Sequence, residues 1–128
     1  MGMTNALRDY WAQVTIGEAV TAFNTANARI GVGDSAATFD PVQTDLQAAT
    51  NKLRKAMEAT YPLRSSNVLT FRSLFATGDA NFDWNEWGVF NAASAGVMMN
   101  RKVESLGTKT SAQSWQLTAT ITVNAPAG

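Results

Sequence analysis

Four oxygen-bearing side chains that lie close together in the chain are the first candidates for chemistry. They are Asp79, Asn81, Asp83 and Glu86. Such oxygens suit calcium, but a helix-loop-helix calcium loop needs Gly at its sixth position and Glu at its twelfth. Counted from Asp79, those positions hold Trp84 and Phe90. We therefore predict no metal site in this run.

Two of these carboxylates, Asp83 and Glu86, resemble the acid pair of a glycosidase, in which two carboxyl groups face each other across a sugar. In a strand, however, residues separated by an odd number point to opposite faces. We therefore expect no catalytic pair. Instead, we expect Glu86 to hold a turn or a strand end by hydrogen bonds, or to meet Arg72 or Arg101 on a neighbouring strand.

Two glycine-containing turns could suggest a phosphate-binding loop. They span Gly31–Ser35 and Gly107–Thr110. Neither has the glycine spacing or the Gly-Lys-Ser/Thr sequence of nucleotide-binding loops, so both are interpreted as ordinary turns. We predict no cofactor.

Histidine and cysteine are both absent. The commonest general base, the commonest metal ligand, thiol chemistry and disulfides are therefore excluded. Together with the failed motifs, this predicts that the protein is not an enzyme.

The charge pattern excludes two partner classes. Ten basic and ten acidic residues give zero net charge, and the chain lacks the clustered positive charge that nucleic-acid binding requires. It also lacks the roughly twenty consecutive apolar residues of a membrane span, and its start has no signal peptide pattern. Charged residues make up only 16% of the chain, which favours a surface partly covered by other proteins. The alternative is that Thr, Ser, Asn and Gln supply the surface polarity.

Two helices are predicted from apolar residues spaced three and four apart. A short one, capped at Thr4-Asn5, runs from Ala6 to Val14. A longer amphipathic one begins at Asp40-Pro41 and ends at Tyr61-Pro62.

Strands are predicted before and after the longer helix. The expected strands are 28–33, 68–75, 82–90, 97–103 and 115–123, the last with strict alternation. We therefore predict an α+β fold: an antiparallel sheet or sandwich of about four or five strands in the C-terminal two-thirds, with the amphipathic helix packed on it and the short helix at the N-terminus. The expected organisation is an N-terminal helical arm (1–25), an α+β assembly domain (26–123) and a flexible tail (124–128).

Several segments, in their order along the chain, resemble a tailed-bacteriophage virion protein. They are Ala28–Asp34, Asp45-Leu46, Asn81–Asn91, Met99–Arg101 and the final strand. The order is similar to the baseplate-attached N-terminal domain of tail fibres, and the resemblance covers about residues 28–123. Glu86 and Gly88 match that family's Glu-x-Gly, and Phe90 matches its terminal aromatic residue.

The resemblance implies a virion structural protein that acts by protein–protein assembly in the tail, the baseplate or a fibre attachment. Because no fibre shaft follows in this sequence, capsid decoration or a head or neck role is the alternative, and a carbohydrate-binding module is the more distant one. The implied partners are other virion proteins and copies of this chain, in a homotrimer or higher ring. The implied location is the virion, after synthesis in the host cytoplasm.

Aromatic residues dominate interface energies, so the tryptophans are candidate contact residues, with core packing as the alternative. The interface candidates are Trp11, Trp84, Trp87, Glu86 and Arg101.

Overall fold

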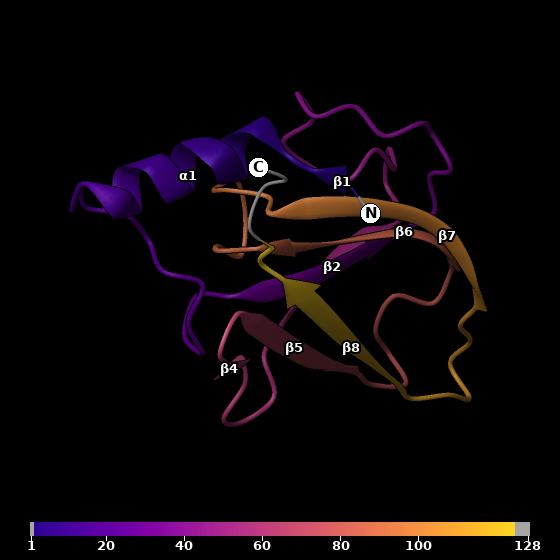
Figure 1. The fold of residues 1–128 in the computed structure, drawn as a ribbon. Coiled ribbons are helices and arrows are strands. Elements are labelled where there is room, and N and C mark those ends of the chain that lie inside the picture. Colours follow the sequence, from indigo (N-terminus) through magenta and orange to yellow (C-terminus); the bar gives the residue numbers. More distant parts are fainter. Residues whose placement is uncertain (1, 125–128) are drawn as a thin grey trace.

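The computed structural model describes residues 2–124 and shows a mainly β fold of two antiparallel sheets with one short N-terminal helix (Figure 1). The elements are β1 (Gly2–Met3), α1 (Asn5–Thr15), β2 (Arg29–Gly33), β3 (Lys52–Ala56), β4 (Leu63–Ser65), β5 (Val68–Phe75), β6 (Asp83–Phe90), β7 (Asn100–Thr108) and β8 (Trp115–Thr122). The predicted flexible tail falls on residues 124–128, of which 125–128 lie outside the described part.

The helix α1 confirms the first helix prediction. The Thr4 Oγ1 accepts a hydrogen bond from the Leu7 N–H at 3.1 Å, which satisfies one of the N–H groups left free in the first turn. The same hydroxyl donates to the Met98 carbonyl, and Leu7 is fully buried. One threonine therefore both caps the helix and attaches it to the chain just before β7.

The larger sheet has the order β1-β7-β6-β2-β3. Its central strand is β6, and the next strand, β2, pairs with β6 on one side and with β3 on the other. Three glycines, at positions 31, 33 and 88, lie in this central part and leave room for neighbouring side chains and backbone. The central part of the sheet is therefore built for close packing.

The smaller sheet has the order β4-β5-β8. In β8 the even-numbered residues are exposed, whereas Ala119 and Ile121 are buried. This alternation confirms the prediction that one face of the last strand packs on the core.

An aromatic and aliphatic core fills the space between the sheets. The Phe75 and Trp84 rings meet edge to face with centroids 4.8 Å apart, and Trp84 and Trp115 do the same at 5.0 Å. These contacts join β5, β6 and β8, so that the two sheets share one hydrophobic core.

The predicted amphipathic helix from Pro41 to Tyr61 is wrong. Part of this segment is the strand β3, and the rest is irregular. All five residues of β3 pair with β2, and the N–H groups of Gln47 and Ala48, which a helix would use internally, donate to Glu86 instead. These long-range partners outweigh the local helical spacing.

Two further details of the predicted sheet need correction. The strand expected at 97–103 lies at Asn100–Thr108, so it includes the first two residues of the turn expected at Gly107–Thr110. The last strands also do not lie in one sheet in their order along the chain, because β5 pairs with β8 while β6 pairs with β7 and β2. Neighbours in sequence are thus divided between two sheets.

Candidate functional site

The Glu86 carboxylate, fully buried on β6, is the centre of the most distinctive polar site. Its Oε1 accepts from the Arg101 Nε at 2.7 Å and from the Gln47 N–H at 2.8 Å. Its Oε2 accepts from the Ala48 N–H at 2.9 Å and from the Ser35 N–H at 3.3 Å. A buried carboxylate is costly unless it is paired and hydrogen-bonded, and Glu86 has both kinds of partner.

The guanidinium of Arg101, from the adjacent strand β7, is also fully buried. Its Nη1 donates to the Ala37 carbonyl at 2.9 Å and to the Gln43 Oε1 at 3.3 Å. Its Nη2 has no hydrogen-bond partner among the described residues. Arg101 therefore ties the strand β7 and Glu86 to the segment between β2 and β3.

We call this segment, residues 34–51, the clamped loop. Glu86 accepts three backbone N–H groups from it, and Arg101 donates to two of its oxygens. Charge-assisted hydrogen bonds are stronger than neutral ones. The ion pair consequently fixes the path of a long loop that has no regular structure of its own.

Glycine 33 makes room for the carboxylate. It pairs directly with Glu86 across β2 and β6, and a Cβ at this position would lie 2.3 Å from the Glu86 Oε2. The glycine is required by the close approach of the carboxylate and not by a positive φ. The turn at Gly31–Ser35 and the Glu-x-Gly segment noted in the sequence thus meet at one place.

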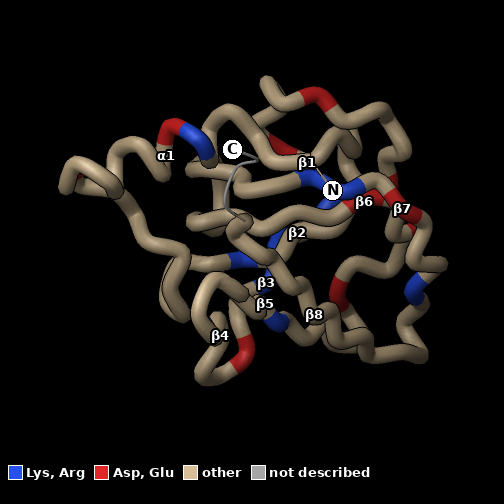
Figure 2. Tube along the Cα trace, in the orientation of Figure 1, with Lys and Arg blue, Asp and Glu red and all other residues tan. Residues whose placement is uncertain are grey.

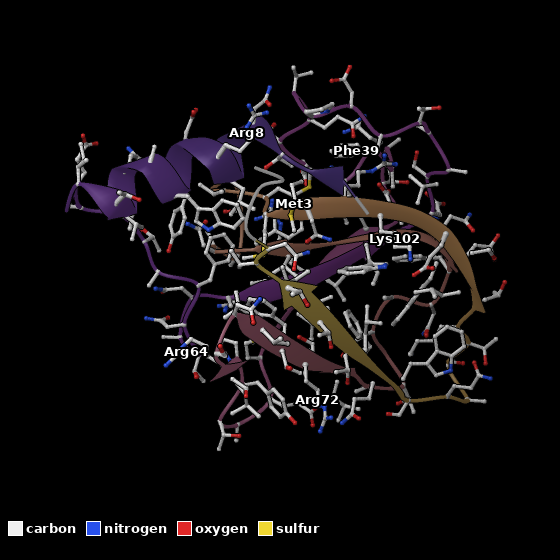
Figure 3. All side chains as sticks on the ribbon, in the orientation of Figure 1. Met3, Arg8, Phe39, Arg64, Arg72 and Lys102 are labelled. Carbon is white, nitrogen blue, oxygen red and sulfur yellow. The ribbon has the colours of Figure 1, made fainter. Side chains whose placement is uncertain are left out.

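The clamped loop also reaches the N-terminal strand. A Cβ at Gly2 would lie 2.2 Å from the Phe39 ring, so this ring fills the space beside β1, and Figure 3 shows Phe39 near Met3. The loop is thereby packed against β1 as well as hydrogen-bonded to β6 and β7.

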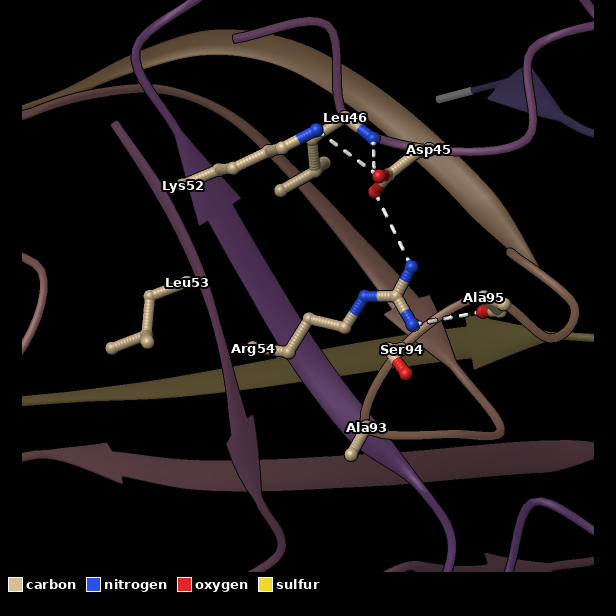
Figure 4. Close-up of a pocket in the computed structure, with 8 residues that line it drawn as sticks. All are labelled: Asp45, Leu46, Lys52, Leu53, Arg54, Ala93, Ser94 and Ala95. Atoms are coloured by element: carbon tan, nitrogen blue, oxygen red, sulfur yellow. Dashed lines mark hydrogen bonds and ion pairs between the residues drawn. The ribbon is translucent and has the colours of Figure 1, made fainter. Parts of the chain in front are cut away.

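A second ionic cluster holds the far end of the clamped loop (Figure 4). Asp45 accepts from the Lys52 Nζ at 3.1 Å and from the Arg54 Nη2 at 3.3 Å. Arg54 also donates to the carbonyls of Ala92 and Ala95, at 3.0 and 2.9 Å, and its guanidinium lies 3.7 Å from the centroid of the Phe90 ring. Of these residues, Asp45, Lys52, Arg54 and Ala95 line a pocket of about 300 Å³.

The Asp45 carboxyl titrates below its ordinary range. Partial burial raises its pKa, but the hydrogen bonds from Lys52, from the Leu46 N–H and from Arg54, with the charge of Lys52, outweigh burial and lower the pKa below the usual 3.8. Asp45 is therefore held as a carboxylate between two cations.

The five interface candidates do not form one exposed patch. Glu86 and Arg101 are fully buried, Trp84 and Trp87 are 2% and 7% exposed, and Trp11 is a partly buried neighbour of the core. The indole N–H of Trp84 donates to the Ala80 carbonyl at 2.9 Å, and that of Trp87 donates to the Glu104 carboxylate at 3.0 Å. Within the chain, four of the five are interior residues, with Glu86 and Arg101 in direct contact.

The acidic run considered for metal binding is dispersed by the fold. Asp79 pairs with Lys55 at 2.7 Å, Asp83 accepts from the Thr108 hydroxyl, and Glu86 faces Arg101. In residues 2–124 no group of three or more acidic side chains is placed to hold a metal ion. The three acidic residues of this run therefore have separate structural roles.

Sequence reasoning identified Glu86 and Arg101 but missed Gly33, Asp45 and Arg54. The expected contact of Glu86 with Arg101, or with a turn, is confirmed in both forms. The clue for Gly33 was its place in the turn at Gly31–Ser35. No pattern in the sequence indicated the contacts of Asp45 and Arg54, because the segment that contains both residues was interpreted as one helix.

The chain was compared with known proteins. No protein-family model matches it, and no curated protein matches its sequence. Among the described residues, no helix is both long enough and apolar enough to cross a membrane.

Proposed function

We propose that this protein is a bacteriophage virion structural protein that acts by protein–protein assembly, as a tail, baseplate or fibre-attachment component. The observation that supports it best is how the residues carrying the resemblance are used. Gly33, Glu86 and Arg101 meet at one buried point and hold the clamped loop in place. The charges of Glu86 and Arg101 are buried and inaccessible to a partner. The three residues act instead by fixing the shape of the clamped loop.

A fixed loop is what an assembly module requires. A loop that is ordered before binding loses less conformational entropy on binding, and this favours affinity. The clamped loop is held by Glu86, Arg101 and Arg54 from three different strands. We propose that its outer side contacts a neighbouring virion protein and that copies of the chain associate with one another.

The burial of Trp84 and Trp87 favours assembly over carbohydrate binding. A sugar-binding tryptophan must present a flat exposed face, whereas the rings of Trp84 and Trp87 are buried in the chain's own core. Their indole N–H groups are also already hydrogen-bonded within the chain.

Immunogold labelling tests the proposal. Particles would be purified from a culture in which this chain is expressed, labelled with antibodies against it, and imaged by electron microscopy, with mass spectrometry of the same particles. We expect label at the tail or baseplate. Label over the capsid would place the protein in the capsid-decoration class. Absence of the chain from intact particles by both methods would overturn the proposal.

A further inference from the structure

The outer edge of β8 is the starting point. The Val123 N–H donates to the Asn67 carbonyl at 2.8 Å, and the register pairs Thr122 with Val68 and Ala119 with Phe71. In an antiparallel ladder, alternate residues direct both backbone polar groups toward the partner strand. The odd-numbered residues of β8 therefore bond to β5. The even-numbered ones direct their N–H and C=O groups away from it.

A hydrogen bond on the other side of β5 agrees with this assignment of inward-directed and outward-directed residues. The Arg72 carbonyl accepts from the Glu58 N–H at 2.9 Å, on the side away from β8, as the alternation requires. The outward-directed set on β8 is Gln116, Thr118, Thr120 and Thr122. In the described part of the chain, no backbone hydrogen bond reaches these groups.

The other sheet edges carry features that discourage pairing between chains. Charged side chains, very short strands and covering segments are common protections of an edge. β3 carries Lys52, Arg54 and Lys55, β4 has only three residues, and β7 carries Lys102 and Glu104 and is covered at its start by β1.

The β8 edge has none of these protections. It is eight residues long and has no charge, proline or glycine, and Figure 2 shows the strand free of Lys, Arg, Asp and Glu. An edge of this length without protection is suited to pairing with another strand.

We infer that the β8 edge is a contact with a second copy of this chain, paired antiparallel about a two-fold axis at Ala119. This rests on the proposal that the protein acts by assembly, and it names one partner. In this register Thr118 lies opposite Thr120 of the second copy and Gln116 lies opposite its Thr122, so every outward-directed residue meets another of the same set. No like charges are brought together.

The same register matches two apolar features at the ends of the strand. Val123 is 38% exposed and falls opposite Trp115 of the second copy, on the same face of the joined sheet. Trp115 lines a pocket of about 320 Å³ with Trp84, Leu106 and Leu117 among its walls. The contact therefore places an exposed valine of each copy beside an apolar pocket of the other. A register shifted by two residues leaves one of the four outward-directed positions without a β8 residue opposite it.

A charge-swap experiment tests the contact. The variants are Thr118→Lys with Thr120→Lys, and Thr118→Glu with Thr120→Glu. In each pure variant, like charges face each other across the axis, whereas a mixture of the two brings lysines opposite glutamates. Light scattering during size exclusion would measure mass. We expect the purified wild-type protein to have twice the mass of either variant in solution. The mixture of the two variants should regain the wild-type mass.

Two further variants guard against unfolding or general charge effects. Ser111→Lys with Ala112→Lys adds the same charge in an exposed loop and should keep the wild-type mass. Thr120→Pro removes one outward N–H without breaking the ladder with β5 and without adding charge, and should halve the mass. Circular dichroism would confirm that each variant is folded.

A wild-type chain that is monomeric, or lysine and glutamate variants that keep the wild-type mass, would overturn the inference. These outcomes are distinct from failure of the proposed function. A β8-paired dimer absent from phage particles would support the contact and remove the virion role, and a monomer present on particles would do the reverse.

Discussion

At the scale of single residues, one carboxylate organises three separate parts of the chain. Glu86 takes backbone N–H groups from both ends of the clamped loop and the guanidinium of Arg101 from β7. The carboxylate of Glu86 and the guanidinium of Arg101 are fully buried, so solvent cannot compensate either one if its partner is lost. The energetic consequence of changing this residue should be large.

We expect Glu86→Gln to lower the free energy of unfolding by about 3–5 kcal/mol, because it leaves a buried arginine without its counter-ion. The amide would also direct donors toward the N–H groups of the clamped loop. Urea unfolding followed by tryptophan fluorescence would measure the change. Glu18→Gln, at an exposed side chain, is the matched control and should leave stability nearly unchanged. Equal stability of the two variants would contradict a structural role for the buried carboxylate.

Gly33→Ala tests the close approach to the carboxylate. The added Cβ would lie 2.3 Å from the Glu86 Oε2, so we expect a loss of about 1–3 kcal/mol from overpacking. Gly78→Ala is the control, since a Cβ there meets nothing within 4 Å. Chemical denaturation of both variants gives the comparison, and a neutral Gly33→Ala would mean that the carboxylate can move aside at no cost.

At the scale of elements, two groups of ionic contacts hold the clamped loop. The buried pair holds its two ends and middle, whereas the partly exposed cluster of Asp45, Lys52 and Arg54 joins it to β3 and to the loop after β6. The second cluster is partly accessible to solvent, and the pKa of its carboxyl group is lowered, so its contribution should depend on pH.

The pKa of Asp45 is lowered in the folded protein, so folding favours its charged form. The stability it contributes is complete above its ordinary pKa of 3.8 and is lost as the pH falls through the lower folded-state value. We therefore expect Asp45→Asn to be less stable than the wild type at neutral pH. The difference should shrink as the pH falls below about 4. Urea unfolding across this pH range would show it. A difference independent of pH would mean that the carboxylate charge is not involved.

At the scale of the whole molecule, two sheets share one core but differ in how their edges are protected. Of the edges in residues 2–124, the outer side of β8 is the long uncharged one. A folded chain that pairs through this edge gains stability by mass action, because only the folded form binds.

The thermal midpoint should therefore rise with protein concentration for the wild type. For the Thr118→Lys, Thr120→Lys variant we expect a midpoint independent of concentration, since pairing is lost. Differential scanning calorimetry over a wide concentration range would measure both. A wild-type midpoint that does not move with concentration would contradict association of the folded chain.

The sequence alone predicted the features that depend on neighbouring residues. The helix α1 and the strands β2, β5 and β8 follow from local spacing and alternation, which reflect the geometry of the backbone itself. The separation of Asp83 from Glu86 follows from the same alternation, and the structure has Asp83 exposed and Glu86 buried.

Only the tertiary structure decided what depends on distant partners. The segment containing Leu46, Leu53 and Met57 has helical spacing, yet Lys52–Ala56 is a strand because β2 offers it a complete ladder. The partners of Glu86 lie 15 to 51 residues away, so no local pattern could specify them. Glu86 itself was visible in the sequence. Its burial, and the loop that it holds, arise from strand pairing and packing that bring these segments together.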